Sequence, residues 1–192
     1  MSAYWILVAI LLPIIGGISI HFFPSEKKRN SYIFLLMIMI ITSLIVWMLI
    51  LGGPTEVFHI VHFVNDLSIS FKIDGMTMVF AGLVSILWPL ATLYGFEYME
   101  HYERKNTFFM FYSIAYGVTL GIAFASDMLS MYFFYELLTL TTVPLVMHTM
   151  SRDAIHATRK YLYYSLGGAA FALMGTVFLM VYQITLLNRI LQ

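Results

Sequence analysis

Glu136 is the residue of this sequence with the clearest potential for chemistry, because it is a lone carboxylate in a long uncharged stretch. From Met128 to Ser151 no other Asp, Glu, Lys or Arg occurs. As a helix, this stretch crosses the roughly 30 Å hydrocarbon core of a bilayer and places Glu136 about 12 Å from its start. Inserting an acidic side chain at that depth costs on the order of 3 kcal/mol, so its presence points to a function.

Several polar groups are expected close to Glu136. On a helix, Tyr132 and Thr139 share its face, one turn away on either side. Pro144 has no N–H, so the carbonyl of Leu140 loses its usual partner within the helix. This patch can hold water or a cation, and a carboxylate whose proton affinity depends on a nearby cation is the basic element of a proton relay. The alternative is that Glu136 only hydrogen-bonds a neighbouring helix and fixes its packing.

Two further residues are weaker candidates for an ion path. His148 follows Glu136 by twelve residues, and an imidazole exchanges protons near neutral pH. A position among the lipid headgroups is an equally good interpretation. Lys160, next to Arg159, opens the last apolar stretch, where it is either part of an inner access path or an anchor at the membrane surface.

The composition indicates a membrane protein that carries no redox centre or catalytic residue. Of the 192 residues, 61% are hydrophobic and 10% are charged, whereas soluble domains carry about 25% charged residues. Ten acidic and ten basic side chains balance, so nucleic acid is not expected as a partner. The absence of cysteine excludes thiolate-bound iron–sulfur clusters from this chain. We expect no cofactor, metal or catalytic residue here, and any redox centre belongs to another subunit.

Six uncharged stretches predict an all-α, polytopic membrane helical bundle. Together they form a single transmembrane domain over residues 1–192. The predicted helices cover residues 3–23, 31–52, 75–96, 107–126, 128–149 and 161–188.

The loop over residues 53–74 differs from the other connections. Leu67, Ile69, Phe71 and Ile73 alternate with polar residues, which is typical of a half-buried strand. A second strand-like run covers 57–64, and Asn65–Asp66 suits the turn between them. We therefore predict a short extracytoplasmic β-hairpin. His59 and His62 lie on it at a spacing that places them on opposite faces of a strand, so a metal pair is not expected.

The distribution of basic residues predicts the orientation. The first stretch begins with MSAYW, which lacks the basic start of a cleaved signal peptide. Of the ten basic residues, eight fall on one side of the predicted membrane and two on the other. The positive-inside rule then places both termini outside a cell membrane. The eight are Lys27, Lys28, Arg29, Arg104, Lys105, Arg152, Arg159 and Lys160, and the two are Lys72 and Arg189.

Small residues recur at four-residue spacing in two stretches. Gly117, Gly121 and Ala125 form one such stripe, and Gly168 and Ala172 form another. Stripes of this kind let a second helix approach closely. They predict tightly packed neighbours, some of them from other chains.

The run FASDMLSMYFFYELLTLTTVPLVMH, followed by AIHATRKYLYYSLGGAAFALMG, resembles the antiporter-like membrane subunits of complex I, of Mrp-type cation/proton antiporters and of membrane-bound hydrogenases. IDGMTMVF and LYGFEYM also resemble that family, so the similarity extends over essentially the whole chain. It implies that Glu136 is the family's mid-membrane glutamate, and the KYLYYSLGG block with Lys160 supports the match.

The chain departs from that family where it stops. Family members continue into a second, inverted half, in which a broken helix carries a lysine that partners the glutamate. The chain therefore resembles the amino-terminal part of such a subunit, and the resemblance implies that the lysine comes from another chain. The implied function is a proton- or sodium-translocating subunit, or half-subunit, of a redox-driven pump or antiporter, among other membrane subunits in the bilayer. The alternative is a non-conducting structural subunit in which Glu136 serves packing.

Overall fold

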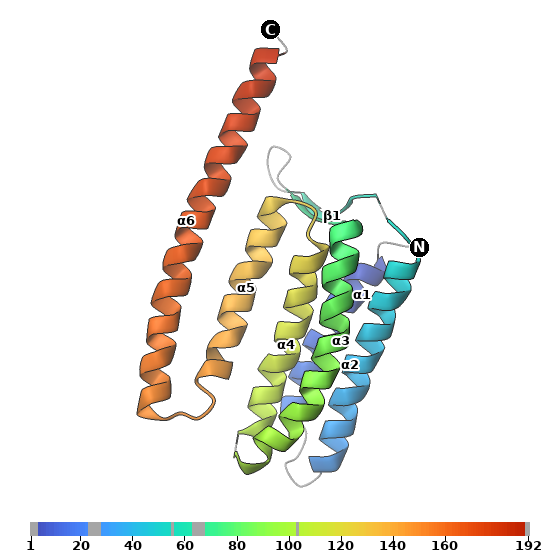
Figure 1. Ribbon diagram of the computed structural model, residues 1–192, viewed down its shortest axis with the longest axis vertical. Coiled ribbons are helices and arrows are strands. Elements are labelled where there is room, and N and C mark those ends of the chain that lie inside the picture. The colour runs from blue at the N-terminus through green and yellow to red at the C-terminus, as the bar shows by residue number, and fades with distance from the viewer. Residues whose placement is uncertain (1–3, 23–27, 55, 63–67, 103, 191–192) are drawn as a thin grey trace.

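The computed structural model is a bundle of long helices with a two-stranded sheet at one end (Figure 1). It describes residues 4–22, 28–54, 56–62, 68–102 and 104–190. Six helices in this part of the chain are long and apolar enough to span a membrane, which confirms the predicted fold class. The elements are α1 (Tyr4–His21), α2 (Lys28–Leu51), β1 (Phe58–His62), β2 (Ser68–Phe71), α3 (Gly75–Tyr98), the 3-10 turn η2 (Met99–His101), α4 (Lys105–Phe124), α5 (Met128–Val146) and α6 (Arg152–Ile190).

Most helix ends lie within one to three residues of the predicted boundaries, and two of the differences have a clear local cause. α6 begins at Arg152 instead of 161, because the Ser151 hydroxyl accepts the Ala154 N–H at 3.1 Å and caps the helix there. α5 ends at Val146, two residues after Pro144, instead of at 149. The absence of charge thus marks the stretch inside the membrane, whereas capping groups and proline decide where the helix itself begins and ends.

Successive helices run in opposite directions. The first residues of α1, α3 and α5 and the last residues of α2, α4 and α6 lie at the end that carries the sheet (Figure 1), which we call the hairpin end. The connections containing Arg104 and Arg152 lie at the opposite end, which we call the basic end. The basic connections are therefore grouped at one end of the bundle, as the sequence predicts.

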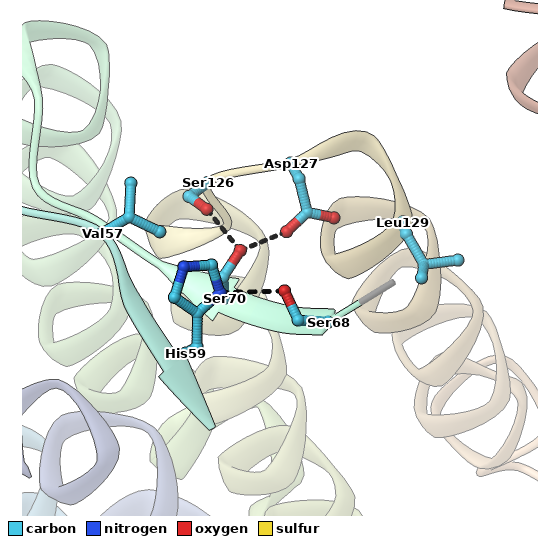
Figure 2. Close-up of a pocket in the computed structure, with 7 residues that line it drawn as sticks. All are labelled: Val57, His59, Ser68, Ser70, Ser126, Asp127 and Leu129. Carbon is cyan, nitrogen blue, oxygen red and sulfur yellow. Dashed lines mark hydrogen bonds between the residues drawn. The ribbon is translucent and has the colours of Figure 1, made fainter. Parts of the chain in front are cut away.

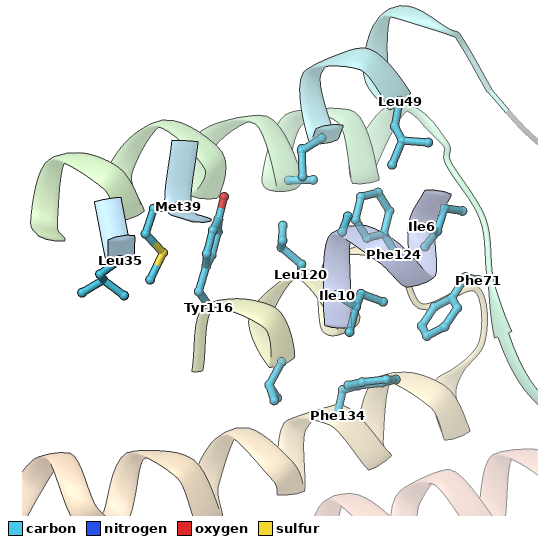
Figure 3. Close-up of a cluster of buried hydrophobic side chains, with 14 of the residues drawn as sticks. Ile6, Ile10, Leu35, Met39, Leu49, Phe71, Tyr116, Leu120, Phe124 and Phe134 are labelled. Atoms are coloured by element: carbon cyan, nitrogen blue, oxygen red, sulfur yellow. The ribbon is translucent and has the colours of Figure 1, made fainter. Parts of the chain in front are cut away.

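The buried core lies among α1, α2, α3 and α4, with α5 added along one side (Figure 3). A Cβ on Gly117 would collide with the Ile10 carbonyl oxygen of α1, and one on Gly121 with the Phe134 ring of α5. The predicted close neighbours of the α4 stripe are thereby confirmed. In contrast, a Cβ on Gly168 of α6 would meet no atom of the described residues within 4 Å. Fully buried members of this core include Ile6, Leu35, Met39, Phe71, Tyr116, Leu120 and Phe124.

The predicted β-hairpin is present, with β1 and β2 paired antiparallel. Phe71 is fully buried, but Ser70 on the other face is only 2% exposed, so the strand is buried on both faces. The reason is the α4–α5 connection: the Ser70 N–H donates to the Ser130 hydroxyl at 2.9 Å, and the Ser70 carbonyl accepts the Ser126 N–H at 3.0 Å. The predicted turn at Asn65–Asp66 lies outside the described residues, as does the side chain of His62.

Candidate functional site

Glu136 lies on α5 in line with the hydroxyls that join this helix to α6. One turn further on, the Thr139 hydroxyl lies 3.2 Å from that of Ser165, and the Thr142 hydroxyl lies 2.8 Å from that of Tyr161. We call these four residues the hydroxyl ladder. Helical spacing puts Glu136 and Thr139 on the same face, so Glu136 continues the ladder toward the middle of the bundle.

One oxygen of the Glu136 carboxylate lacks a hydrogen-bond partner in the described part of the chain. This atom, Oε1, is buried. Tyr132, one turn before it, interacts electrostatically with the carboxylate. A buried acceptor without a partner costs on the order of 1–3 kcal/mol, and more when it is charged. The site is therefore suited to a proton, a water molecule or a cation at this oxygen.

The carbonyl of Leu140 is a second acceptor on α5. Pro144 lies inside α5, where it cannot donate to that carbonyl. Among the described side chains, none donates to it, because the hydroxyls of Thr141 and Thr142 turn to the Leu138 carbonyl, each at 3.0 Å. Two oxygen acceptors one turn apart on α5 thus have unused hydrogen-bonding capacity.

His148 lies in an aromatic cage at the basic end. Its ring centroid is 5.3 Å from that of Tyr102, 5.6 Å from that of Phe108 and 6.3 Å from that of Tyr98. Nδ1 lies 2.8 Å from the Leu145 carbonyl, and Nε2 is buried and unpaired among the described residues. The imidazole is therefore half-buried, with its Nε2 atom covered by protein. It is also far from Glu136, since the end of α5 is already about 15 Å along the axis.

Lys160 is exposed on α6, next to Tyr161 of the hydroxyl ladder. Tyr161 meets Thr142, which lies six residues, or about 9 Å, beyond Glu136 along α5. The structure thus brings Tyr132, Glu136 and Thr139 together and leaves Lys160 nearer the basic end.

The sequence analysis does not identify the residues of α6 that bond to the hydroxyls of α5. Tyr161 and Ser165 face α5, and their four-residue spacing in KYLYYS is the signal that could have identified them. The prediction for this stretch considered its charges, its small-residue stripe and its resemblance to a family, but not its hydroxyl groups.

A second polar cluster, also absent from the prediction, holds the hairpin in place (Figure 2). The Asp127 carboxylate accepts hydrogen bonds from the Ser70 hydroxyl and, at 2.8 Å, from the Ser130 N–H. His59 Nδ1 lies 2.8 Å from the Ser68 hydroxyl, and these residues line a hollow of about 250 Å³. Asp127 precedes Glu136 by nine residues, or two and a half turns, which places it on the opposite face of α5. This cluster is therefore separate from the Glu136 patch.

Comparison with known proteins finds similar membrane subunits. Residues 62–109 match the family model described as the N-terminus of chain 5 of NADH-ubiquinone oxidoreductase (complex I). One of the Na(+)/H(+) antiporter subunits of Alkalihalophilus pseudofirmus is 27% identical over 65% of this chain and 16% of its own length. A chloroplastic NAD(P)H-quinone oxidoreductase chain 4 from Angiopteris evecta is 25% identical over 92% of this chain and 36% of its own length. The chain is similar to membrane subunits of antiporters and of NAD(P)H-quinone oxidoreductases.

A solved structure shows the same fold. A chain of the membrane-bound sulfane sulfur reductase, an archaeal respiratory membrane complex, superposes with a TM-score of 0.76 at 18% identity. The match covers 88% of this chain and 36% of that chain. This chain therefore spans about a third or less of the proteins it matches, and its six apolar helices make it a multi-pass membrane protein.

Proposed function

We propose that the chain is a proton- or sodium-translocating membrane subunit, or part of one, in a multi-subunit redox-driven pump or cation/proton antiporter. Glu136 takes up and releases the proton or binds the cation near the middle of the membrane. The observation that carries this proposal is the buried, unpaired Oε1 atom of Glu136 on a spanning helix. A group that only fixed packing would have its carboxylate oxygens paired.

Tyr132, Thr139 and the Leu140 carbonyl freed by Pro144 form the polar surroundings of the transferred ion. Their oxygen atoms suit either a hydrated proton or sodium, since hard cations favour oxygen ligands. His148 and Lys160 extend the path to the basic end. The buried, unpaired Nε2 of His148 supports this role, because it offers a proton-exchanging nitrogen between Glu136 and that surface.

A positive charge near Glu136 must come from another part of the assembly. Lys160 lies nearer the basic end of α6, and no atom of the described residues fills the space beside Gly168. Other membrane subunits are the expected partners, since the relatives are subunits of larger complexes. A lysine brought close to Glu136 by such a neighbour would favour the charged carboxylate, and its withdrawal would favour proton uptake.

The decisive experiment replaces Glu136 with Gln in the native complex and measures both ion transport in vesicles and assembly of the complex. The amide keeps the size of the side chain and removes its charge, so we expect transport to fall at least about tenfold with assembly intact. The matched control is Glu97→Gln, at an exposed carboxylate near the basic end of α3. Unchanged transport contradicts the proposal, and lost assembly with normal transport in the remaining complex identifies a structural subunit.

We also propose that the hairpin end faces outward from a cell membrane and the basic end faces the cytoplasm. The natural sequence has no cysteine, so single substitutions give a clean test. Gly53→Cys at the hairpin end should react with an impermeant maleimide in intact cells, whereas Met150→Cys at the basic end should react only after permeabilisation. The reverse pattern contradicts this orientation.

A further inference from the structure

A groove separates α3 from α4 at the hairpin end of the bundle. Phe80 and Val84 line it from α3, Ile122 and Ala123 from α4, and Met131 from α5. Its volume is about 300 Å³, at the lower end of the roughly 300–1,000 Å³ typical of small-ligand sites. Its walls are mainly apolar, and Asp74 stands at its mouth.

The depth of the groove matches one leaflet of a bilayer. Asp74 and Val84 are ten residues apart, which corresponds to about 15 Å along α3, or half of the roughly 30 Å hydrocarbon core. One turn deeper, Trp88 of α3 stacks on Tyr116 of α4 with ring centroids 5.4 Å apart. This stacked pair brings the two helices together and closes the groove near the middle of the membrane.

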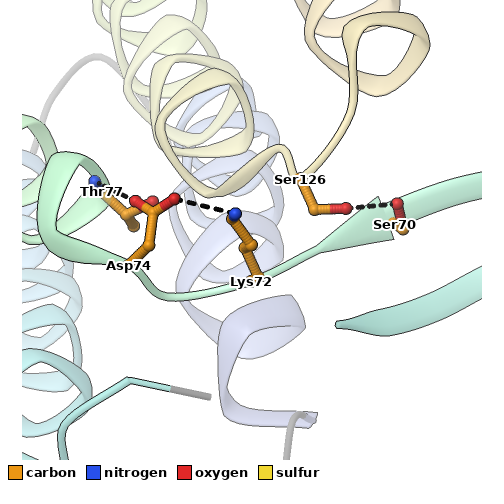
Figure 4. Close-up of polar contacts among 5 residues, drawn as sticks. All are labelled: Ser70, Lys72, Asp74, Thr77 and Ser126. Carbon is orange, nitrogen blue, oxygen red and sulfur yellow. Dashed lines mark hydrogen bonds and ion pairs between the residues drawn. The ribbon is translucent and has the colours of Figure 1, made fainter. Parts of the chain in front are cut away.

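The mouth of the groove carries a pair of opposite charges (Figure 4). Lys72 Nζ lies 3.1 Å from Asp74 Oδ2, and their side chains are 36% and 41% exposed. Asp74 also accepts the Thr77 N–H at 2.9 Å. The Thr77 N–H first, and Lys72 second, lower the pKa of Asp74 to about 2, so the carboxylate is charged at physiological pH. Both charges remain accessible from the headgroup region.

We propose that this groove binds one phospholipid with a zwitterionic, primary-amine headgroup, such as phosphatidylethanolamine. One acyl chain lies between Phe80 and Ala123, the phosphate faces Lys72, and the amine faces Asp74. The volume argues against a helix from a partner, because a helix about 10 Å wide and 15 Å long occupies more than about 1,000 Å³. The paired charges argue against an anionic lipid, whose headgroup has no cation for Asp74.

The proposal is tested by native mass spectrometry of the chain from nanodiscs with equal phosphatidylethanolamine and phosphatidylglycerol. We expect one phosphatidylethanolamine to remain bound to the unaltered protein. Ala123→Trp fills the groove and should lower that bound fraction about tenfold. The matched control is Ala91→Trp on an exposed position of α3 outside the groove, which should leave binding unchanged. Helicity measured by circular dichroism verifies that both variants fold.

A second variant tests headgroup recognition separately from the groove. Lys72→Gln combined with Asp74→Asn should leave a lipid bound but remove the preference for phosphatidylethanolamine. Equal lipid loss in the two tryptophan variants would overturn the proposal, as would binding unaffected by Ala123→Trp. A crosslink from Ala123→Cys to a neighbouring subunit in the native complex would also overturn it, because that subunit would fill the groove.

Discussion

The α1–α4 part of the bundle and the α5–α6 pair differ in the partners of the carbonyls that proline frees. α3 and α5 each contain a proline that frees a carbonyl four residues earlier. In α3 the carbonyl freed by Pro89 belongs to Ser85, and the Ser43 hydroxyl of α2 donates to it at 2.7 Å. In α5 no described side chain donates to the Leu140 carbonyl freed by Pro144. The two prolines therefore leave carbonyls in different surroundings: a described side chain donates to the carbonyl in α3, and none donates to the carbonyl in α5.

The glycines show the same contrast. Gly117 of α4 lies against the α1 backbone, whereas no described atom lies where a Cβ of Gly168 of α6 would be. The α4 stripe thus packs within this chain, and the described residues leave the Gly168 face of α6 uncovered.

The largest expected effect distinguishes the two glycines. Gly117→Ala should lower the free energy of unfolding by about 1–3 kcal/mol, because its Cβ would push against the Ile10 carbonyl oxygen and the backbones would have to separate. Gly168→Ala, as the matched control, should leave it unchanged. Thermal unfolding in detergent measures both. Equal losses would contradict the contrast between the two regions.

A smaller effect is expected where the hairpin meets α5. Asp127→Ala removes the cap of α5 and the acceptor for the Ser70 and Ser130 hydroxyls. We expect a loss of about 0.5–2 kcal/mol and faster hydrogen exchange of the β2 amides. Transport by the assembled complex should persist, since Asp127 lies on the face of α5 away from Glu136. Lost transport with a stable hairpin would instead assign Asp127 to the ion path.

Removing a single hydroxyl group should lower the free energy of unfolding by less. Ser43→Ala removes the donor to the Ser85 carbonyl and the contact with the Tyr116 hydroxyl, and should cost about 0.6 kcal/mol, the average for hydrogen bonds between membrane helices. Ser165→Ala breaks only the contact with Thr139 and should cost less. Double-mutant cycles for Ser43 with Tyr116 and for Ser165 with Thr139 measure the two coupling energies. A larger coupling energy between Ser165 and Thr139 would contradict the expectation.

The smallest effect concerns pH. The Thr77 N–H and Lys72 lower the pKa of Asp74 from 3.8 to about 2. The charged carboxylate therefore stabilises the folded state above about pH 4, and this stabilisation is lost as the pH falls through about 2. Hydrogen exchange at the first turn of α3 should rise over that interval. Asp74→Asn should show no such rise. A rise in both variants would assign the change to another group.

The sequence predicts the elements better than it predicts their neighbours. Six uncharged stretches identify the helices, because a bilayer requires continuous apolar residues. The position of Glu136 on α5 follows from the same reasoning. Its surroundings do not, because Ser165 and Tyr161 are recognised only when α6 is placed beside α5. The burial of Ser70 likewise depends on the α4–α5 connection, which local alternation does not specify.

α6 is much longer than the other helices, and its apolar span, Arg152–Leu179, has 28 residues. α6 has 39 residues and is about 58 Å long, whereas α1–α5 have 18–24 residues and are about 27–36 Å long. Its last turns extend beyond the other helices at the hairpin end (Figure 1). In a thinner bilayer, hydrophobic mismatch is relieved by tilting. Such a tilt would change the angle of α6 to α5 at the level of Glu136, so lipid chain length would adjust the space beside the carboxylate.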